Sequence, residues 1–340
     1  MELFWGLLII ALGSFGQSSS YVPVKRVREW SWEGFWLTQG IFAWILFPLA
    51  GAWAILPEGY GLASLFTAEG SILAIVYGAL WGVGGLTFGL SMRYLGVALG
   101  QSISLGTCSA FGTLLPVIFG GTDLFHGKGA ILLGGVCITL AGIAVIGYAG
   151  SLRSKTMSRA DRDAAIRDFA LTKGLLVALL AGIMSACFAL GLDAGQPLRE
   201  HMIAAGVAPL FAGLPVVALV TLGGFVTNAV YCLRPHGRKG MKGFLSVPRA
   251  VFTSNVLFCA LAGGLWYSQF FGLEVGRTFL TDSPVLLAFS WSILMALNVV
   301  FSNMWGVILH EWRGSGRRTM CVLAVGLALL VFSVFFSSLF

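Results

Sequence analysis

Long stretches without a charged residue or histidine dominate the pattern of polar and apolar positions. Ten such runs follow one another along the chain: 3–24, 34–57, 70–92, 94–122, 129–152, 174–192, 202–233, 250–273, 283–309 and 319–340. Each run holds at least 19 residues, and about 20 helical residues cross a hydrocarbon layer about 30 Å thick. The pattern therefore predicts ten membrane-spanning helices. The runs 94–122 and 202–233 are long enough to include a loop each.

Composition supports a membrane protein and excludes most soluble classes. Charged residues make up 10% of the chain and apolar residues 57%, with a mean hydropathy of +0.89, whereas about a quarter of an average globular domain is charged. Soluble enzymes and nucleic-acid-binding modules are disfavoured. The first run has only Met1 and Glu2 before it, so we expect a span rather than a cleaved signal peptide. The six cysteines form no C-x-x-C pair, and neither a metal nor a cofactor is expected.

The positions of lysine and arginine predict the orientation, because short loops rich in these residues stay in the cytoplasm. The loops after spans one, three, five, seven and nine hold 18 of the 21 basic residues. The other side keeps Lys128, Arg199 and Arg277. Loops that follow odd-numbered spans are therefore predicted to be cytoplasmic, and both termini are predicted to face outward.

The longest charged segment, residues 151–173, divides the chain into two halves of five spans. We predict a first five-helix repeat over residues 1–150, a cytoplasmic linker over 151–173 and a second five-helix repeat over 174–340. An odd number of spans in each half inverts the second half in the membrane. Many secondary transporters have this inverted-repeat design, with the substrate site near the midplane.

Four groups of short strings resemble one known family. They are Y-V-P-V-K-R-V-R-E-W-S-W-E at 21–33, W-G-V-G at 81–84 with G-L-S-M-R-Y-L-G at 89–96, N-V-L at 255–257 with W-Y-S-Q-F-F at 266–271, and E-W at 311–312 with G-R-R at 316–318. The chain is similar in these strings, over its whole length, to the bacterial L-rhamnose–proton symporters of the drug/metabolite transporter superfamily. The resemblance implies an all-α, ten-helix inner-membrane transporter with a 5+5 inverted repeat and periplasmic termini, which imports a 6-deoxyhexose with a proton.

The chain departs from the family pattern at three places. Gly85-Leu86-Thr87 stands where the family has N-x-N, Gln101 and Ser102 replace apolar residues or glycine, and Asp193 replaces an amide. Lost amides on one helix and new polar groups on the next suggest a rearranged sugar site.

A neutral sugar needs amides, hydroxyls and indole N–H groups for its hydroxyls, and aromatic faces for its C–H surfaces. Trp266 lies roughly 22 Å along span eight, near the midplane, and Gln269 shares its helical face. The alternative for such aromatic residues is an interfacial belt. The predicted substrate-binding residues are Gln17, Trp81, Gln101, Trp266, Tyr267, Gln269 and Asn298. Gln39, near the end of span two, is expected to be structural.

Proton coupling requires a group that changes charge during the cycle, and the candidates are Asp193 and Glu274. Both map near the outer ends of their spans, where an ordinary helix-end charge is the alternative. Arg93, in a short turn between spans three and four, is a candidate for gating or for anchoring that turn. One proton per sugar gains about 2.3 kcal/mol from 100 mV, which supports a roughly 40-fold concentration ratio at 1.4 kcal/mol per tenfold.

Two other classes remain open at this stage. A metabolite or amino-acid exporter or facilitator of the same superfamily differs only in substrate and direction. An intramembrane enzyme is disfavoured, because the sequence contains no H-E-x-x-H, no G-x-S-x-G and no G-x-G-x-x-G after a strand pattern. The expected partners are a small sugar, a proton and the lipid bilayer, and no nucleic acid. The sequence leaves the oligomeric state open.

Overall fold

Apolar helices account for nearly all of the described part of the chain. A computed structural model describes residues 1–95, 97–156, 171–234 and 241–336, without the side chains of residues 93, 97–99, 156 and 242. The described elements are α1 (Glu2–Ser19), α2 (Tyr21–Val24), α3 (Trp32–Gly40), the π-helix η1 (Ile41–Leu46), α4 (Phe47–Trp53), the 3₁₀ helix η2 (Leu62–Phe66), α5 (Ser71–Leu95), α6 (Val97–Phe119), α7 (Gly127–Thr156), α9 (Leu171–Ala194), α10 (Gln196–Ala204), α11 (Leu214–Cys232), the 3₁₀ helix η3 (Met241–Gly243), α13 (Arg249–Arg277), α14 (Pro284–Ile308) and α15 (Arg317–Phe336). Within these residues the fold is all-helical.

Ten of the described segments are long and apolar enough to cross a membrane, which confirms the predicted number of spans. The loop expected inside the run 202–233 lies at residues 205–213, before α11 begins. Helix α13 ends at Arg277, so Glu274 lies in its last turn. The prediction for Arg93 was wrong: α5 continues through Arg93 to Leu95, so this residue is not in a turn. Of the predicted linker, residues 157–170 lie outside the described part.

The described helices pack as two compact units. Unit 1 consists of Met1–Gly82 and Gly191–Phe279, and unit 2 of Val83–Leu190 and Leu280–Phe340. Each unit therefore combines segments from both halves of the sequence. This grouping reports packing rather than internal symmetry, so the predicted five-helix repeats remain a prediction.

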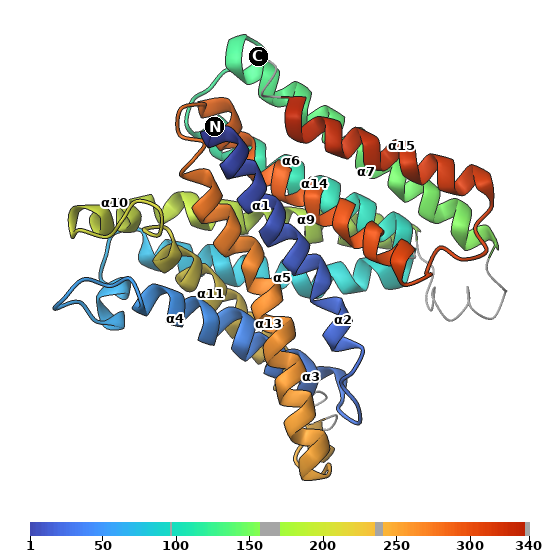
Figure 1. Cartoon of the computed structure of the whole chain (residues 1–340), viewed down its shortest axis with the longest axis horizontal. Coiled ribbons are helices and arrows are strands. Elements are labelled where there is room, and N and C mark those ends of the chain that lie inside the picture. The colour runs from blue at the N-terminus through green and yellow to red at the C-terminus, as the bar shows by residue number, and fades with distance from the viewer. Residues whose placement is uncertain (96, 157–170, 235–240, 337–340) are drawn as a thin grey trace. The chain divides into compact units, whose positions relative to one another are not determined.

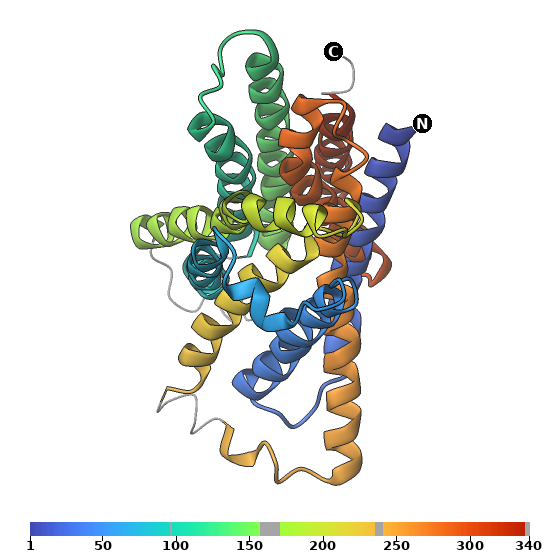
Figure 2. The same cartoon turned by 90° about the vertical axis from the view of Figure 1, so that its left-hand side faces the viewer.

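In unit 1, α1 lies alongside the C-terminal half of α13 (Figures 1 and 2). Small residues make this close approach possible: a Cβ added to Gly13 would lie 2.5 Å from the carbonyl oxygen of Ser268, and one on Gly276 would lie 2.8 Å from that of Gly6. The hydroxyl of Ser268 donates to the carbonyl of Gly13 at 3.1 Å. Glycine-lined seams of this kind are how helices associate in lipid, where no hydrophobic force brings them together.

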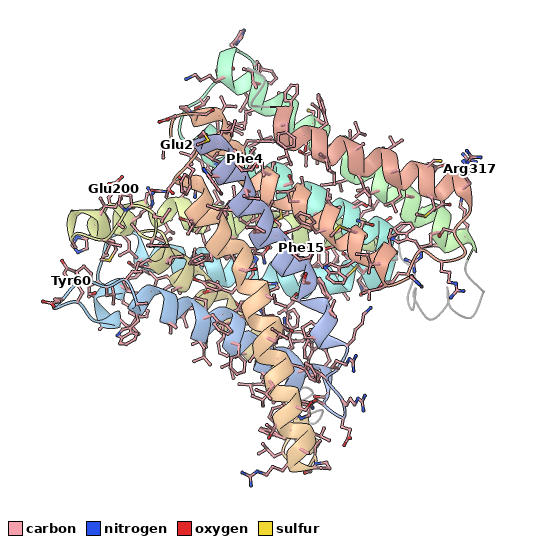
Figure 3. The ribbon with its side chains drawn as sticks, in the orientation of Figure 1. Glu2, Phe4, Phe15, Tyr60, Glu200 and Arg317 are labelled. Carbon is pink, nitrogen blue, oxygen red and sulfur yellow. The ribbon has the colours of Figure 1, made fainter. Side chains whose placement is uncertain are left out.

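Large apolar side chains cover the outer face of α1. Phe4 and Phe15 are exposed, and Figure 3 shows them along the helix. Such residues would be costly in water, whereas in lipid they face a solvent of their own kind. At one end of unit 1, labelled by Tyr60 and Glu200 in Figure 3, the ring of Tyr60 lies 5.9 Å from that of His201. Polar and aromatic residues therefore gather at an end of the apolar helices.

In unit 2, α7 and α15 run alongside each other (Figure 1). A Cβ on Gly326 would lie 3.0 Å from the backbone nitrogen of Ile146, and one on Gly142 would lie 2.7 Å from the side chain of Leu330. The guanidinium of Arg153 lies 5.3 Å from the ring centre of Trp312, part of the E-W string. Glycine contacts along the helices and a cation–π contact at their end hold this pair together.

The string at residues 21–33 is fastened to α13 by one amide. The side chain of Asn255 accepts a hydrogen bond from the backbone N–H of Arg28 at 3.1 Å and donates to the carbonyl of the same residue at 2.7 Å. Beside it, the ring of Trp30 packs 4.3 Å from that of Phe244 and 5.5 Å from that of Phe252. Two of the strings that carry the family resemblance thus form one structural joint.

Candidate functional site

Unit 1 contains a cluster of tryptophan rings from three separate spans. The ring of Trp44 on η1 lies 5.9 Å from that of Trp81 on α5 and 5.8 Å from that of Trp266 on α13. Trp81 and Trp266 lie 5.8 Å apart, and Phe270 packs 5.2 Å from Trp266. Trp36 on α3 extends the cluster, 5.4 Å from Trp44. We call these five residues the tryptophan cluster. It confirms that Trp81 and Trp266 come together.

Glycines on the neighbouring turns make room for the indoles. A Cβ on Gly40 would lie 2.8 Å from the ring of Trp44, and one on Gly224 would collide with the ring of Trp81. Trp44 is buried, whereas Trp81 and Trp266 each keep part of their surface accessible. The cluster therefore presents accessible aromatic surface on two rings and fixes the third from behind.

Some polar groups around the cluster are satisfied within unit 1. The indole N–H of Trp36 donates to Oδ1 of Asn228 at 2.9 Å, and Nδ2 of Asn228 donates to the carbonyl of Gly224 at 2.8 Å. Nε2 of Gln269 donates to the carbonyl of Trp266 at 3.2 Å. The amide of Gln269 is thus on the same face of α13 as Trp266, as its spacing predicts, and turns back on its own helix.

Among the buried polar atoms that have no hydrogen-bond partner in the described residues are Nε1 of Trp44, which belongs to the cluster, Oε1 of Gln39 and the hydroxyl of Tyr267. All three side chains are more than nine-tenths buried. A buried donor or acceptor left unpaired costs about 1–3 kcal/mol, so native proteins keep few of them. Indole faces with unpaired donors and acceptors nearby suit a neutral ligand rich in hydroxyl groups.

One carboxylate is buried among the described residues of unit 1. Glu274 is 6% exposed, and its Oε1 accepts a hydrogen bond from Nη1 of Arg277 at 3.2 Å. Its other oxygen lies against Gly213, which caps the N-terminus of α11. The guanidinium of Arg277 and the positive end of the α11 helix dipole both stabilise this buried carboxylate.

The remaining predicted residues are placed less favourably for a site or lie elsewhere. Asp193 is exposed at the end of α9, and Gln17 on α1 is half-buried and accepts a hydrogen bond from the hydroxyl of Ser18 at 3.2 Å. Gln101 on α6 and Asn298 on α14 are half-buried and belong to unit 2. The side chain of Arg93 is outside the described ones.

Unit 2 has a tryptophan core of its own, on α14. The indole N–H of Trp291 donates to the carbonyl of Cys108 at 3.2 Å, and its ring stacks on that of Phe188 at 5.8 Å. On the next residue, the hydroxyl of Ser292 hydrogen-bonds those of Ser109 at 2.9 Å and Thr113 at 2.8 Å. This core is buried and satisfied, so it offers a ligand nothing.

Sequence reasoning missed three members of the unit 1 site: Trp36, Trp44 and Asn228. Two of them were visible as tryptophans in one predicted span, with Pro48 four residues after Trp44. A proline interrupts regular helical hydrogen bonding at that distance, and this was the available signal. The pairing of Trp36 with Asn228 joins residues 192 positions apart, which no local pattern reports.

Comparisons with known proteins show the family to which the chain belongs. The sequence model of the family described as "L-rhamnose-proton symport protein (RhaT)" matches residues 1–339. The L-rhamnose-proton symporter of Mannheimia succiniciproducens is 34% identical over 340 residues, covering 97% of this chain and 95% of that protein. The L-rhamnose-proton symporters of Salmonella dublin and Salmonella enteritidis are each 33% identical over 337 residues, with the same coverage. This multi-pass membrane protein therefore belongs to the L-rhamnose-proton symport protein family.

Proposed function

We propose that this chain imports L-rhamnose together with a proton, and that it is a transporter rather than an enzyme. The observation that carries the proposal is the tryptophan cluster together with the unpaired buried polar atoms of Trp44, Gln39 and Tyr267, in a chain that belongs to a symporter family along its whole length. The relatives are named for exactly one sugar and one ion.

The sugar is proposed to bind at the accessible faces of Trp81 and Trp266. Indole faces pack against the C–H surface of a sugar ring, and the methyl group of a 6-deoxyhexose adds an apolar edge that an aromatic wall favours. The hydroxyl of Tyr267 supplies a directional contact. Gln269 lies on the same helix face as Trp266. Its amide donates to the carbonyl of Trp266 and is proposed to turn toward the sugar when the sugar binds.

Three further residues remain candidates for substrate binding. Gln17 lies on α1, which packs along α13. Gln101 and Asn298 belong to unit 2 and carry amides within apolar spans. Polar side chains within apolar spans are rare and often functional, which is the reason to retain them.

Glu274 is proposed to carry the coupled proton. It is buried, whereas the other candidate, Asp193, is exposed. Protonation of Glu274 removes the charge that Arg277 and the N-terminus of α11 stabilise. The electrostatic attraction between Glu274 and its two neighbours, Arg277 and the start of α11, therefore weakens when the proton binds, as coupling requires. Arg93 stays a candidate for gating.

The proposed architecture is the 5+5 inverted repeat of the drug/metabolite transporter superfamily, working by alternating access. The distribution of basic residues supports an inner-membrane location with both termini in the periplasm. The two repeats, residues 1–150 and 174–340, would then move against each other so that the substrate site opens to one side of the membrane at a time. Residues 151–173 would join the repeats in the cytoplasm.

Uptake into proteoliposomes tests the function. Purified protein is supplied with labelled L-rhamnose, L-fucose or an amino-acid mixture, with and without an inward proton gradient. Accumulation of L-rhamnose that needs the gradient supports the proposal. Gradient-independent equilibration indicates a facilitator, and uptake of amino acids but not of L-rhamnose indicates a different substrate class. Either of these results contradicts symport of the sugar.

Glu274→Gln tests the coupling residue, with Asp193→Asn as the matched control. Glu274→Gln is expected to exchange labelled L-rhamnose for unlabelled sugar across the membrane but to lose accumulation against a gradient. Asp193→Asn is expected to accumulate sugar like the wild type. If both variants accumulate L-rhamnose normally, Glu274 does not carry the proton.

A further inference from the structure

The second span contains a π-helical turn just before Pro48. Residues Ile41–Leu46 form η1, and the N–H of Phe47 bonds to the carbonyl of Phe42, five residues earlier. Pro48 follows. Because proline has no N–H and its ring clashes with the carbonyl four residues before it, here that of Trp44, the helix widens at this point. Single π-turns of this kind occur frequently at functional sites.

Two unpaired polar atoms bracket the start of this turn. Gln39 lies immediately before Gly40, where η1 is capped, and Trp44 lies within the turn. Gln39 is 8% exposed and Trp44 is 5% exposed. Oε1 of the first and Nε1 of the second have no hydrogen-bond partner in the described part of the chain. One is an acceptor and the other a donor, so they are complementary to a ligand hydroxyl group, which both donates and accepts.

The surroundings of Trp44 explain why its N–H stays unpaired. Its ring contacts Gly40, Trp36, Trp81 and Trp266, which present aromatic surface or a bare backbone. The neighbouring indole of Trp36 has an acceptor in Asn228, 2.9 Å away. Of these two neighbouring indoles, unit 1 thus satisfies the N–H of the half-buried Trp36 and leaves that of the buried Trp44 without a partner among the described residues.

We propose that Gln39 and Trp44 recognise the hydroxyl groups of the sugar: the indole N–H of Trp44 donates to one hydroxyl oxygen, and Oε1 of Gln39 accepts from a sugar O–H. The inference rests on the proposed function and deepens it, because it assigns the specificity for sugar hydroxyls to span two, where Gln39 was expected to be structural. The free energy lost by leaving these atoms unpaired in the protein alone is recovered when the sugar binds. A site built this way rejects an analogue that lacks the matching hydroxyl.

Calorimetric binding of L-rhamnose and its monodeoxy analogues tests the inference. The wild type is expected to bind at least one of the 2-, 3- and 4-deoxy analogues about 10-fold more weakly than L-rhamnose, the equivalent of 1.4 kcal/mol. Trp44→Phe is expected to bind L-rhamnose about 10-fold more weakly and to lose no further affinity for one of those analogues. Gln39→Leu is also expected to bind L-rhamnose about 10-fold more weakly, and to lose no further affinity for the analogue that lacks the hydroxyl bound by Gln39. This variant tests the acceptor separately if Trp44→Phe does not fold.

Trp291→Phe is the matched control, because Trp291 is also 5% exposed but its N–H is paired. It is expected to lower thermal stability and to keep the analogue preference of the wild type. The inference is overturned if Trp44→Phe and Gln39→Leu keep that preference, or if they weaken all sugars by one common factor. Failure of the wild type to bind L-rhamnose would overturn the proposed function and this inference together.

Discussion

The two tryptophan cores of this protein have the same depth and opposite chemistry. Trp44 in unit 1 and Trp291 in unit 2 are each 5% exposed. Trp291 donates to a backbone carbonyl and stacks on Phe188. The next residue, Ser292, hydrogen-bonds two other hydroxyl groups. Trp44 touches three other indoles and has no acceptor among the described residues.

The difference separates a structural core from the proposed binding site. Full satisfaction of buried polar groups fixes one arrangement and stabilises it, whereas unpaired groups store a preference for a partner that arrives from outside. Burial and residue type alone do not distinguish the two cores. The hydrogen bonds do distinguish them. The unpaired groups of the proposed site lie in unit 1, which also contains the π-helical turn and the buried carboxylate Glu274.

The largest expected contrast is between Trp291→Ala and Trp266→Ala. Trp291→Ala removes a buried, paired indole and should cost about 3–5 kcal/mol of stability, with an unchanged Kd for L-rhamnose in the protein that remains folded. Trp266 is only half-buried, so its truncation should cost less stability and weaken the sugar by about 100-fold, or roughly 2.8 kcal/mol. Thermal unfolding in detergent and calorimetry measure both. Weakened sugar binding in Trp291→Ala with normal binding in Trp266→Ala would reverse the assignment.

Asn228→Ala tests whether unit 1 depends on the paired indole N–H of Trp36. The substitution leaves the N–H of Trp36 buried without its acceptor, and we expect a loss of about 1–3 kcal/mol of stability. Asn228→Asp keeps an acceptor oxygen and serves as the comparison in the same melting experiment. An Asn228→Ala variant as stable as the wild type would show that pairing around the cluster has no energetic weight.

Ser292→Ala tests the closed hydroxyl chain of unit 2. Ser109 and Thr113 both lose a partner, and about 1 kcal/mol of stability should be lost for a neutral hydrogen bond. The affinity for L-rhamnose should not change, as isothermal calorimetry can determine. A loss of sugar affinity without a loss of stability would move part of the binding site into unit 2.

The smallest expected effect is a gain. A Cβ on Gly85, within α5, would meet nothing within 4 Å, and replacing a helical glycine by alanine stabilises by about 0.5–1 kcal/mol. Gly85→Ala should therefore raise the melting temperature and leave rhamnose uptake rates unchanged. A slower uptake with unchanged binding would identify this glycine as a bending point of span three.

Much of the fold was predictable because lipid imposes a simple rule on sequence. Each apolar run had to be at least one bilayer long, and ten runs gave ten spans. The exact ends were less predictable, since a charge does not stop a helix that can pair it. Glu274 and Arg277, three residues apart on α13, form such a pair inside the last turn. The grouping into two units depends on contacts between distant segments, which charge and hydropathy do not encode.

The candidate site was predictable only in part. Trp266 was found because an aromatic residue near the midplane of a span is informative, and its ring contacts that of Trp81, which was also among the predicted residues. Gln39 and Trp44 were not, because the string I-F-A-W-I-L is typical of an ordinary helix, and Pro48 indicates an interruption without specifying a π-helical turn. An unpaired atom is likewise a property of its neighbours in space, so no spacing rule predicts it.

The most direct test of sugar binding at the unit 1 tryptophan cluster is ¹⁹F NMR of protein labelled with 5-fluorotryptophan, with resonances assigned by single Trp→Phe substitutions. Addition of L-rhamnose is predicted to shift the resonances of Trp44, Trp81 and Trp266 and to leave that of Trp291 in place. A shift confined to Trp291, with the three cluster resonances unchanged at saturating sugar, would contradict the account.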